Sequence, residues 1–299
     1  MDLVKILKST QEELLQLLFT HLSNNGYMNN ILYTNSYIFA KGEIPILLVA
    51  HLDTVHLVTP KSIFIDKEKN VMWSPEGIGG DDRCGVYAIL EIIKEFKPYI
   101  LFTTDEEVGG LGAIGFTNSY NFKLWEEIRY IVEIDRKGNN EAVFYDCGNK
   151  AFKDYILSFG FNEKFGTFSD ISIISPDYDI ASVNLSAGYY NAHTKEEYIN
   201  LEHLANTINA VKLMLADTEN KEFYDFQEKK WNSNLLDKGT PTNEYEDIFE
   251  FEDELSYAEE NEDYYARLVE DWHNLTSEEF EEKHNMKRPK TIEGLWSTL

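Results

Sequence analysis

Acidic residues and histidines follow four apolar stretches of the chain, and both residue types are common ligands of hydrolytic metal centres. These side chains are His51 and Asp53, Glu106 and Glu107, Glu133 and Asp135, and His193. Two further acids, Asp81 and Asp82, lie in a glycine-rich turn. One shared acid, two terminal acids and two histidines would hold a pair of cations. Because these donors are oxygen and imidazole without thiolate, we expect two Zn²⁺ ions, with Co²⁺ or Mn²⁺ as substitutes.

His51 and Asp53 are two residues apart, so on an extended segment their side chains point to the same side. We expect His51 to bind a metal through one ring nitrogen while Asp53 holds the other N–H and sets the direction of the ring. A histidine alone at this position would more simply be a hydrogen-bonded residue at a strand end. The other acids favour the ligand.

Asp81 and Asp82 precede a predicted helix over residues 84–96, after glycines that allow a close approach of the backbone. An acid pair at this position can cap the helix. One of the two can also be shared between two cations, and both roles can hold at once. We predict that Asp81 is the shared ligand.

Glu106 and Glu107 are adjacent residues beyond a strand, so their side chains diverge and can take different roles. Two glutamates alone would most often be solvent-exposed, but the strand before them and the glycines after them favour a functional site. We predict that Glu107 is a ligand. Glu106 is then the general base that takes a proton from the metal-activated water.

Asp135 and His193 complete the predicted ligand set, with Asp135 favoured over Glu133 because it lies deeper in the loop. Because they are near His193 in the sequence, Tyr189 or Tyr190 is suggested as a hydrogen-bond donor to the oxyanion that forms during amide hydrolysis. No role is assigned to the histidines without comparable acidic neighbours in the sequence, which are His21, His56, His203, His273 and His284.

The segments that carry these residues read as buried strands of an α/β fold. Residues 46–50, 100–102, 130–132 and 180–185 are short runs rich in Ile, Val and Leu. In open α/β sheets, functional groups gather beyond the carboxyl ends of such strands. We therefore predict a three-layer α/β/α fold with a central, mostly parallel mixed sheet.

Other local patterns predict the remaining elements. Ser9 or Thr10 can cap a helix, with Glu13 or Glu12 near the third position. Helical spacing of apolar residues predicts a helix over residues 201–215. We also expect one strand over residues 31–40 and a hairpin formed by residues 63–66 and 71–73.

The composition excludes several classes of partner. The formal charge of −26 argues against nucleic acid and against an anionic membrane, because both require a basic surface. The N-terminus does not resemble a secretory signal, and no apolar run approaches the length of a membrane span. With only two cysteines, Cys84 and Cys147, a cytoplasmic protein is the expectation. Cys84 is expected to be a small helix residue rather than a ligand.

The chain changes character after Thr218, which predicts a catalytic domain over residues 1–218 and an acidic extension over residues 219–299. The extension carries 23 Asp and Glu against 9 Lys and Arg. It also contains aromatic residues, which a purely disordered acidic tail would lack. We expect docked helices joined by flexible acidic segments.

The order of the motifs resembles the co-catalytic di-zinc exopeptidase superfamily, which includes zinc aminopeptidases, tripeptidases and glutamyl-aminopeptidase-like enzymes. The matching segments are residues 50–55, 80–86, 104–109, 132–135 and 189–194. The resemblance implies one zinc held by His51, Asp81 and Asp135, and another held by Asp81, Glu107 and His193. It also implies Glu106 as the base and Asp53 as the residue that orients His51. The interval between Asp135 and His193 leaves no room for the lid domain of many relatives.

The favoured function is a metal-dependent aminopeptidase that hydrolyses small peptides with a water activated by two metals. One alternative is an amide hydrolase or deacylase that acts on a non-peptide conjugate. Another is a binding protein that uses this scaffold without catalysis. Neither the side-chain preference nor the oligomeric state follows from the sequence.

Overall fold

The computed structural model describes residues 1–119, 127–220, 222–229 and 276. All of these except Thr276 belong to one compact unit, Met1–Lys238. Residues 222–229 run along this unit, where Tyr224 donates its N–H to the carbonyl of Arg129 and accepts the N–H of Ala181. The rest of the acidic extension, with its predicted helices, lies outside the described residues. The boundary after residue 218 stays a prediction.

A mixed sheet of eight strands forms the centre of the unit, in the order β1-β2-β6-β3-β7-β10-β8-β9. The four neighbouring strands β6, β3, β7 and β10 are parallel and carry the four apolar runs of the sequence. The strands are β1 (Ile31–Tyr33), β2 (Tyr37–Ala40), β3 (Ile44–His51), β6 (Pro98–Thr103), β7 (Tyr130–Arg136), β8 (Glu141–Val143), β9 (Asn162–Lys164) and β10 (Ser182–Ser186).

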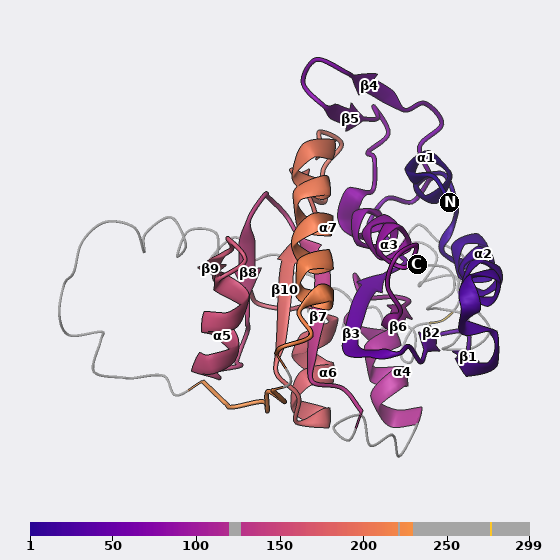
Figure 1. The fold of residues 1–299 in the computed structure, drawn as a ribbon. Coiled ribbons are helices and arrows are strands. Elements are labelled where there is room, and N and C mark those ends of the chain that lie inside the picture. Colours follow the sequence, from indigo (N-terminus) through magenta and orange to yellow (C-terminus); the bar gives the residue numbers. More distant parts are fainter. Residues whose placement is uncertain (120–126, 221, 230–275, 277–299) are drawn as a thin grey trace. The chain divides into compact units, whose positions relative to one another are not determined.

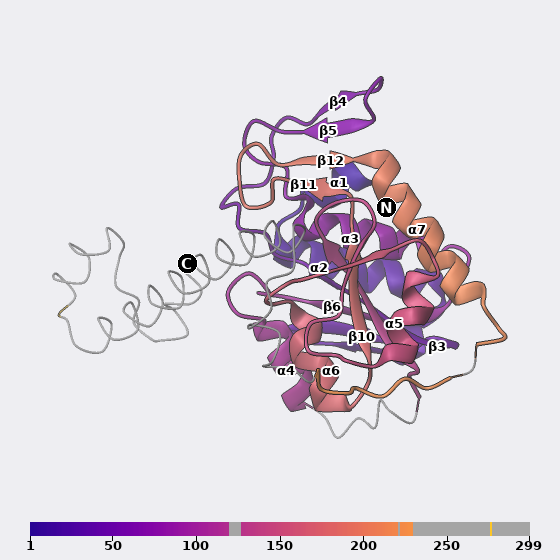
Figure 2. The same ribbon diagram turned by 90° about the vertical axis from the view of Figure 1, so that its left-hand side faces the viewer.

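Helices cover both faces of this sheet, which confirms the predicted three-layer α/β/α fold (Figures 1 and 2). In β3, Leu48 and Ala50 belong to one apolar core, whereas Leu47 and Val49 belong to the other, so successive side chains face opposite layers. One layer contains α1 (Leu3–Leu7), α2 (Gln11–Leu22), α3 (Gly80–Ile92), α5 (Lys150–Leu157) and α7 (Leu201–Ala216). The other contains α4 (Leu111–Ser119) and α6 (Asp170–Tyr178).

Several local predictions are confirmed. Thr10 caps α2 and forms a capping box with Glu13, with both reciprocal hydrogen bonds present. The predicted helices over residues 84–96 and 201–215 correspond to α3 and α7. A short π-helix (Ser23–Tyr27) and a 3₁₀-helix (Met28–Asn30) follow α2.

The prediction of one strand over residues 31–40 is wrong, because the segment forms the antiparallel pair β1 and β2. The side chain of Thr34 accepts the N–H groups of Ser36 and Tyr37, at 3.1 and 2.9 Å. A threonine hydroxyl that binds the backbone two and three residues ahead closes a tight turn. This turn divides the apolar run into a hairpin.

A second, four-stranded sheet combines the predicted hairpin with the segments on either side of His193. Its order is β11-β12-β5-β4, and all of its pairs are antiparallel. The strands are β4 (Phe64–Asp66), β5 (Val71–Trp73), β11 (Tyr189–Tyr190) and β12 (Tyr198–Asn200). His193 therefore lies in the loop of a β-hairpin, between β11 and β12.

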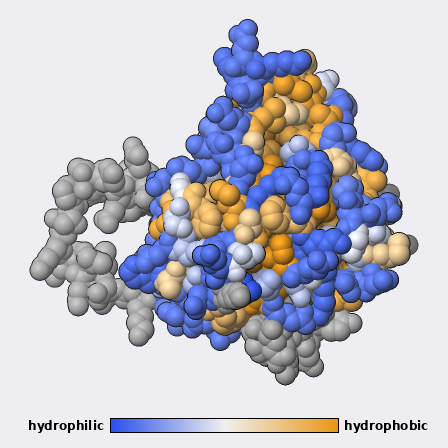
Figure 3. All heavy atoms as spheres, viewed as in Figure 1, coloured by the Kyte–Doolittle hydropathy of each residue, from blue (hydrophilic) through white to orange (hydrophobic). Residues whose placement is uncertain are grey.

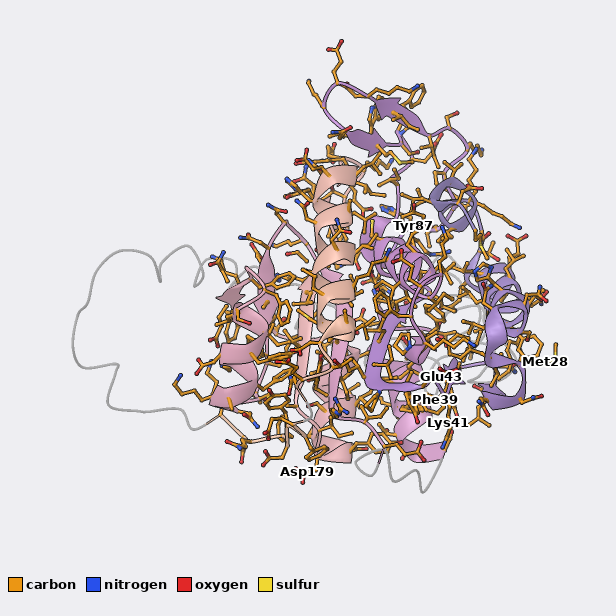
Figure 4. The ribbon with its side chains drawn as sticks, in the orientation of Figure 1. Met28, Phe39, Lys41, Glu43, Tyr87 and Asp179 are labelled. Carbon is orange, nitrogen blue, oxygen red and sulfur yellow. The ribbon has the colours of Figure 1, made fainter. Side chains whose placement is uncertain are left out.

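A groove of about 470 Å³ is lined by residues of α1, α3, α7 and the β4–β5 hairpin. Figure 3 shows apolar atoms at the surface along the seam between α3 and α7, and Tyr87 on α3 borders the groove (Figure 4). None of the predicted site residues lines it. Both cysteines are buried free thiols, and no helix among the described residues is long and apolar enough to cross a membrane.

Candidate metal centre

The predicted ligands come together at the carboxyl ends of the parallel strands. His51 is the last residue of β3, Asp135 lies near the end of β7, and Glu107 follows β6. Asp81 is contributed by the first turn of α3, and His193 by the loop between β11 and β12. Of the five, His193 is the most open, with 33% of its side chain exposed.

His51 is surrounded by carboxylates on both of its ring nitrogens. Its Nδ1 lies 3.2 Å from Oδ1 of Asp53. Its Nε2 faces the other way and lies 3.2 Å from Oδ1 of Asp81 and 3.4 Å from Oδ1 of Asp135. The ring is fully buried, so Asp53 sets its orientation, and Nε2 is directed at two acids.

His193 makes the matching arrangement on the other oxygen of Asp81. Its Nε2 lies 3.2 Å from Oδ2 of Asp81 and 3.2 Å from Oε2 of Glu107. His51, Glu106 and Glu107 form one group of three potential ligands whose ligand atoms lie within 4.8 Å of one another. The other two such groups are His51 with Asp81 and Asp135, and Asp81 with Glu107 and His193. Asp81 belongs to both of these latter groups and offers a different oxygen to each.

The two adjacent aspartates at the start of α3 have separate roles. The backbone angles of Asp82 are non-helical, so the regular part of α3 begins after it, and its Oδ1 accepts the N–H of Gly85 at 2.9 Å, as an acid at a helix start does. Asp81 has non-helical backbone angles, and its carboxylate lies between the two histidines. The peptide bond that joins Asp81 and Asp82 is cis. The structure thus divides capping and the shared position between neighbours, as the sequence suggests.

Asp53 also holds the loop that carries the two glutamates. Its Oδ1 accepts the N–H of Glu106 and its Oδ2 accepts the N–H of Glu107, both at 3.0 Å. Glu106 is buried, and its Oε2 lies 3.9 Å from Nε2 of His51. One carboxylate therefore orients both a histidine and the adjacent glutamates.

Burial of so many acids together raises several of their pKa values. Burial, together with the charge of Asp81, raises the pKa of Asp135 to about 7. Burial also raises the pKa of Glu106 well above its usual value. For His193, burial alone would lower the pKa, but the carboxylates of Asp81 and Glu107 raise it to about 12. The carboxyl shifts come first from burial and then from repulsion among the acids, and a cation close to the acids would oppose both effects.

Two observations indicate that the site residues can hold divalent cations. The donor set consists of carboxylate oxygens and imidazole nitrogens in groups of three, which suits zinc and related metals. Oε1 of Glu107 is buried with no hydrogen-bond partner. A buried carboxylate oxygen without a partner is costly, and a cation beside it would remove that cost.

The hydroxyls of the two tyrosines near His193 are engaged elsewhere. Tyr189 is buried and donates its hydroxyl to the carbonyl of Asp135 at 2.7 Å. The hydroxyl of Tyr190 lies 2.6 Å from Nδ1 of His203. Neither hydroxyl is therefore free for the predicted role at the oxyanion, and Tyr189 instead holds the backbone of Asp135.

The expectation that His56 lacks an acidic neighbour is wrong. Its Nε2 lies 2.8 Å from Oε2 of Glu197, which is only 1% exposed. Glu197 also accepts the N–H of Gly79 at 2.9 Å and that of Asp81 at 3.0 Å. Glu197 therefore holds the backbone of Asp81 in place through these hydrogen bonds. The sequence Lys195-Glu196-Glu197 reads as a charged surface loop, so nothing in it marks this glutamate as buried.

A polar network behind Asp135 is also invisible in the sequence pattern. Asn184 Oδ1 accepts the N–H of Asp135 at 2.9 Å, and Asn184 Nδ2 donates to the hydroxyl of Ser169 at 3.2 Å. Ser169 donates in turn to Glu133. Glu133 is fully buried and belongs to none of the three-residue groups. Its place is beside the site, which agrees with the preference for Asp135.

No family model and no curated protein matches the chain. Among solved structures, aminopeptidase PepT from Bacillus cereus shares its fold with a TM-score of 0.59 and 13% identity, over 71% of this chain and 96% of that one. A tripeptidase from Staphylococcus aureus has a TM-score of 0.57 and 13% identity, over 72% and 97%. The TET aminopeptidase of a marine sediment Thaumarchaeota archaeon has a TM-score of 0.56 and 12% identity, over 71% and 95%. The chain has the α/β fold of these peptidases.

Proposed function

We propose that this chain is a co-catalytic di-zinc exopeptidase, and that it acts as an aminopeptidase on small peptides. One observation carries the proposal: His51 with Asp135, and Glu107 with His193, each approach a different oxygen of Asp81. A shared carboxylate between two sets of nitrogen and oxygen donors is the arrangement that two neighbouring divalent cations require. The peptidase fold supports the same conclusion.

His51, Asp81 and Asp135 would hold one cation, and Asp81, Glu107 and His193 the other. When bound, two Zn²⁺ ions, or Co²⁺ or Mn²⁺ in their place, lower the pKa of water and polarise the scissile carbonyl. The residues of the chain orient the ligands around these ions. Asp53 holds the ring of His51, Tyr189 holds the backbone of Asp135, and Glu197 holds that of Asp81.

Glu106 is the general base of the proposed reaction. Its side chain is buried, and it lies within 3.9 Å of His51 Nε2, on the side of the ring that faces the shared aspartate. It takes a proton from the attacking water as the new carbon–oxygen bond forms. It then gives that proton to the amide nitrogen as the carbon–nitrogen bond breaks. Its backbone is fixed by Asp53, so the carboxylate stays in reach of both positions.

The position of Arg83 favours an aminopeptidase over a carboxypeptidase. Arg83, the buried cation of α3, donates to the carbonyls of Ile6 and Ser9 rather than to a position open to substrate. A carboxypeptidase needs a cation that binds the carboxylate of its substrate, and Arg83 is not placed for this role.

Hydrolysis of matched amides tests the proposal. The metal-loaded full-length protein is assayed with an aminoacyl amide, the same amide carrying an N-acetyl group, and an N-acylated non-peptide conjugate. We expect hydrolysis of the free-amine substrate, at a rate at least 10-fold above the acetylated one. Glu106→Gln should lower kcat by about 100-fold or more, because general-base catalysis typically contributes 10²–10⁴-fold. Its zinc content should match that of the wild-type protein.

Each alternative function gives a distinct result. Preference for the acetylated amide or the conjugate would indicate a deacylase. Absence of turnover with every amide, in protein that holds two zinc ions, would indicate a binding protein. Protein that takes up no metal under loading conditions would refute the metal centre itself.

A further inference from the structure

The first residue of α2 makes two hydrogen bonds with the loop that carries the glutamates. Gln11 and Asp105 are 94 residues apart in the chain. Gln11 Nε2 donates to Oδ1 of Asp105 at 2.9 Å, and Gln11 Oε1 accepts the backbone N–H of Asp105 at 3.1 Å. A single amide thus binds both the side chain and the backbone of the residue that precedes Glu106.

Asp105 is the point where the chain turns away from β6. Its φ angle is +57°, in the left-handed region that residues other than glycine seldom adopt. Aspartate is among the few that tolerate this region, and at a cost. The turn brings the N–H groups of Glu106 and Glu107 to Asp53. The two hydrogen bonds between Gln11 and Asp105 hold Asp105 in this conformation.

The segment that presents Gln11 is itself tightly fixed. Thr10 and Glu13 form the capping box, so Gln11 is placed as the first residue of an ordered helix. Arg83 is buried, and its Nη1 donates to the carbonyls of Ile6 at 3.1 Å and Ser9 at 3.0 Å. Arg83 lies two residues after Asp81 in the chain, so the N-terminal segment is attached beside both ligand-bearing loops.

We propose that Gln11 is a positioning residue that acts through Asp105 to hold Glu106 and Glu107 in place. This role rests on the proposed function of the site. The hydrogen bonds of Gln11 go to Asp105 rather than to the carboxylates of the two glutamates. Its loss would remove both bonds and leave the loop held by Asp53 and by the backbone bonds that Leu111 donates to Asp105 and that Gly109 and Gly110 donate to Glu106. A shift of about 1 Å in a catalytic group can lower a rate about 100-fold.

The test compares Gln11→Ala with Gln16→Ala, the same substitution at an exposed position of the same helix. Both full-length proteins are saturated with zinc and assayed for kcat and KM on an aminoacyl amide. Cobalt titrations followed by visible absorption then measure the two binding steps. We expect Gln11→Ala to lower kcat about 10-fold or more with little change in KM. It should also weaken one cobalt step by about 10-fold, because the proposed assignment gives Glu107 to only one of the two cations. Gln16→Ala should behave as the wild type.

Asp105 provides a rescue experiment that a purely structural role would not predict. In Asp105→Asn, the new carbonyl can still accept from Gln11 Nε2, and the backbone bond remains. In Asp105→Ala, only the backbone bond remains. The kcat of Asp105→Asn should therefore lie closer to that of the wild type than the kcat of Asp105→Ala does.

Wild-type values of kcat and of both cobalt steps in Gln11→Ala would overturn the inference. So would an equal weakening of both steps with a lower unfolding temperature, since this indicates general loss of structure. If kcat falls while both cobalt affinities stay unchanged, the effect is assigned to Glu106 alone, and this result also supports the inference. If the wild type hydrolyses no amide, the proposed function fails, and the cobalt titration still decides the role of Gln11.

Discussion

Glu197 offers a sharp test of how the shared aspartate is held in place. Its buried carboxylate accepts three hydrogen bonds, from His56 Nε2 at 2.8 Å, Gly79 N at 2.9 Å and Asp81 N at 3.0 Å. Oε2 serves the first two donors, and Oε1 serves Asp81 alone. Glu197→Gln can keep an oxygen at the Oε2 position, but its NH₂ group then faces the N–H of Asp81, donor against donor.

The expected cost follows from this geometry. The buried N–H of Asp81 loses its acceptor, and a buried donor without a partner costs about 1–3 kcal/mol. Glu197→Ala removes the acceptors of both buried N–H groups and should cost roughly 2–6 kcal/mol by the same reasoning. Outer residues that orient ligands typically change metal affinity about 10–100-fold. We expect that range for Glu197→Gln.

Glu196→Gln is the matched control, because it makes the same change at the exposed neighbour. Urea unfolding of metal-free protein gives the free energy of unfolding, and competition with a zinc chelator gives the affinity. The control should alter neither quantity beyond a few tenths of a kcal/mol. Equal effects of the two substitutions would refute the view that Glu197 supports Asp81, whatever the catalytic activity of the variants.

Two further predictions concern packing and charge. Gly112→Ala should destabilise the fold by about 1–3 kcal/mol, because the new Cβ would lie 2.4 Å from the carbonyl oxygen of Thr104. Gly115→Ala in the same helix meets only the Ser36 side chain at 3.3 Å and should be near neutral in the same urea experiment. Burial raises the pKa values of Asp135 and Asp170 to about 7, so the native metal-free protein binds more protons than the unfolded chain between about pH 4 and 7. Its stability should therefore fall as the pH rises through this window, and removal of metal with a chelator should lower the unfolding temperature more at pH 8 than at pH 5.5. Metal-free protein that is equally stable at both pH values would contradict this reasoning.

The sequence predicts those features that depend on local pattern. The four apolar runs become adjacent parallel strands, and acids placed just after such strands must meet at one edge of the sheet. For this reason the sequence alone assigns His51 and Glu107 to one site. The capping box of Thr10 and Glu13 is local in the same sense. The structure shows that these side chains converge, whereas their roles as metal ligands stay predictions.

Contacts between distant polar residues could not be predicted. Gln11 and Asp105 are 94 residues apart, and Glu197 and Asp81 are 116 apart. Hydrophobic periodicity sets which face of an element is buried, but it says nothing about which polar side chain reaches across to another element. The segment 170–178 illustrates a second limit. It forms α6, although Pro176 lies inside it.

The predicted ligands differ in how firmly neighbouring residues hold them, and this difference indicates where a substrate would reach the proposed centre. Asp81 is fixed through its backbone by Glu197 and is followed by a helix that Asp82 caps. His51 is held by Asp53 and is fully buried. His193 instead lies in a hairpin loop, at a φ angle of +63°, with a third of its side chain exposed. Because Asp81 is enclosed and His193 is exposed, the open side of this cluster of residues lies at His193. In the proposed reaction, a peptide would approach Glu106 past the β11–β12 loop, where the predicted ligands are least enclosed. On this proposal, we expect side-chain preference to depend on residues near that loop.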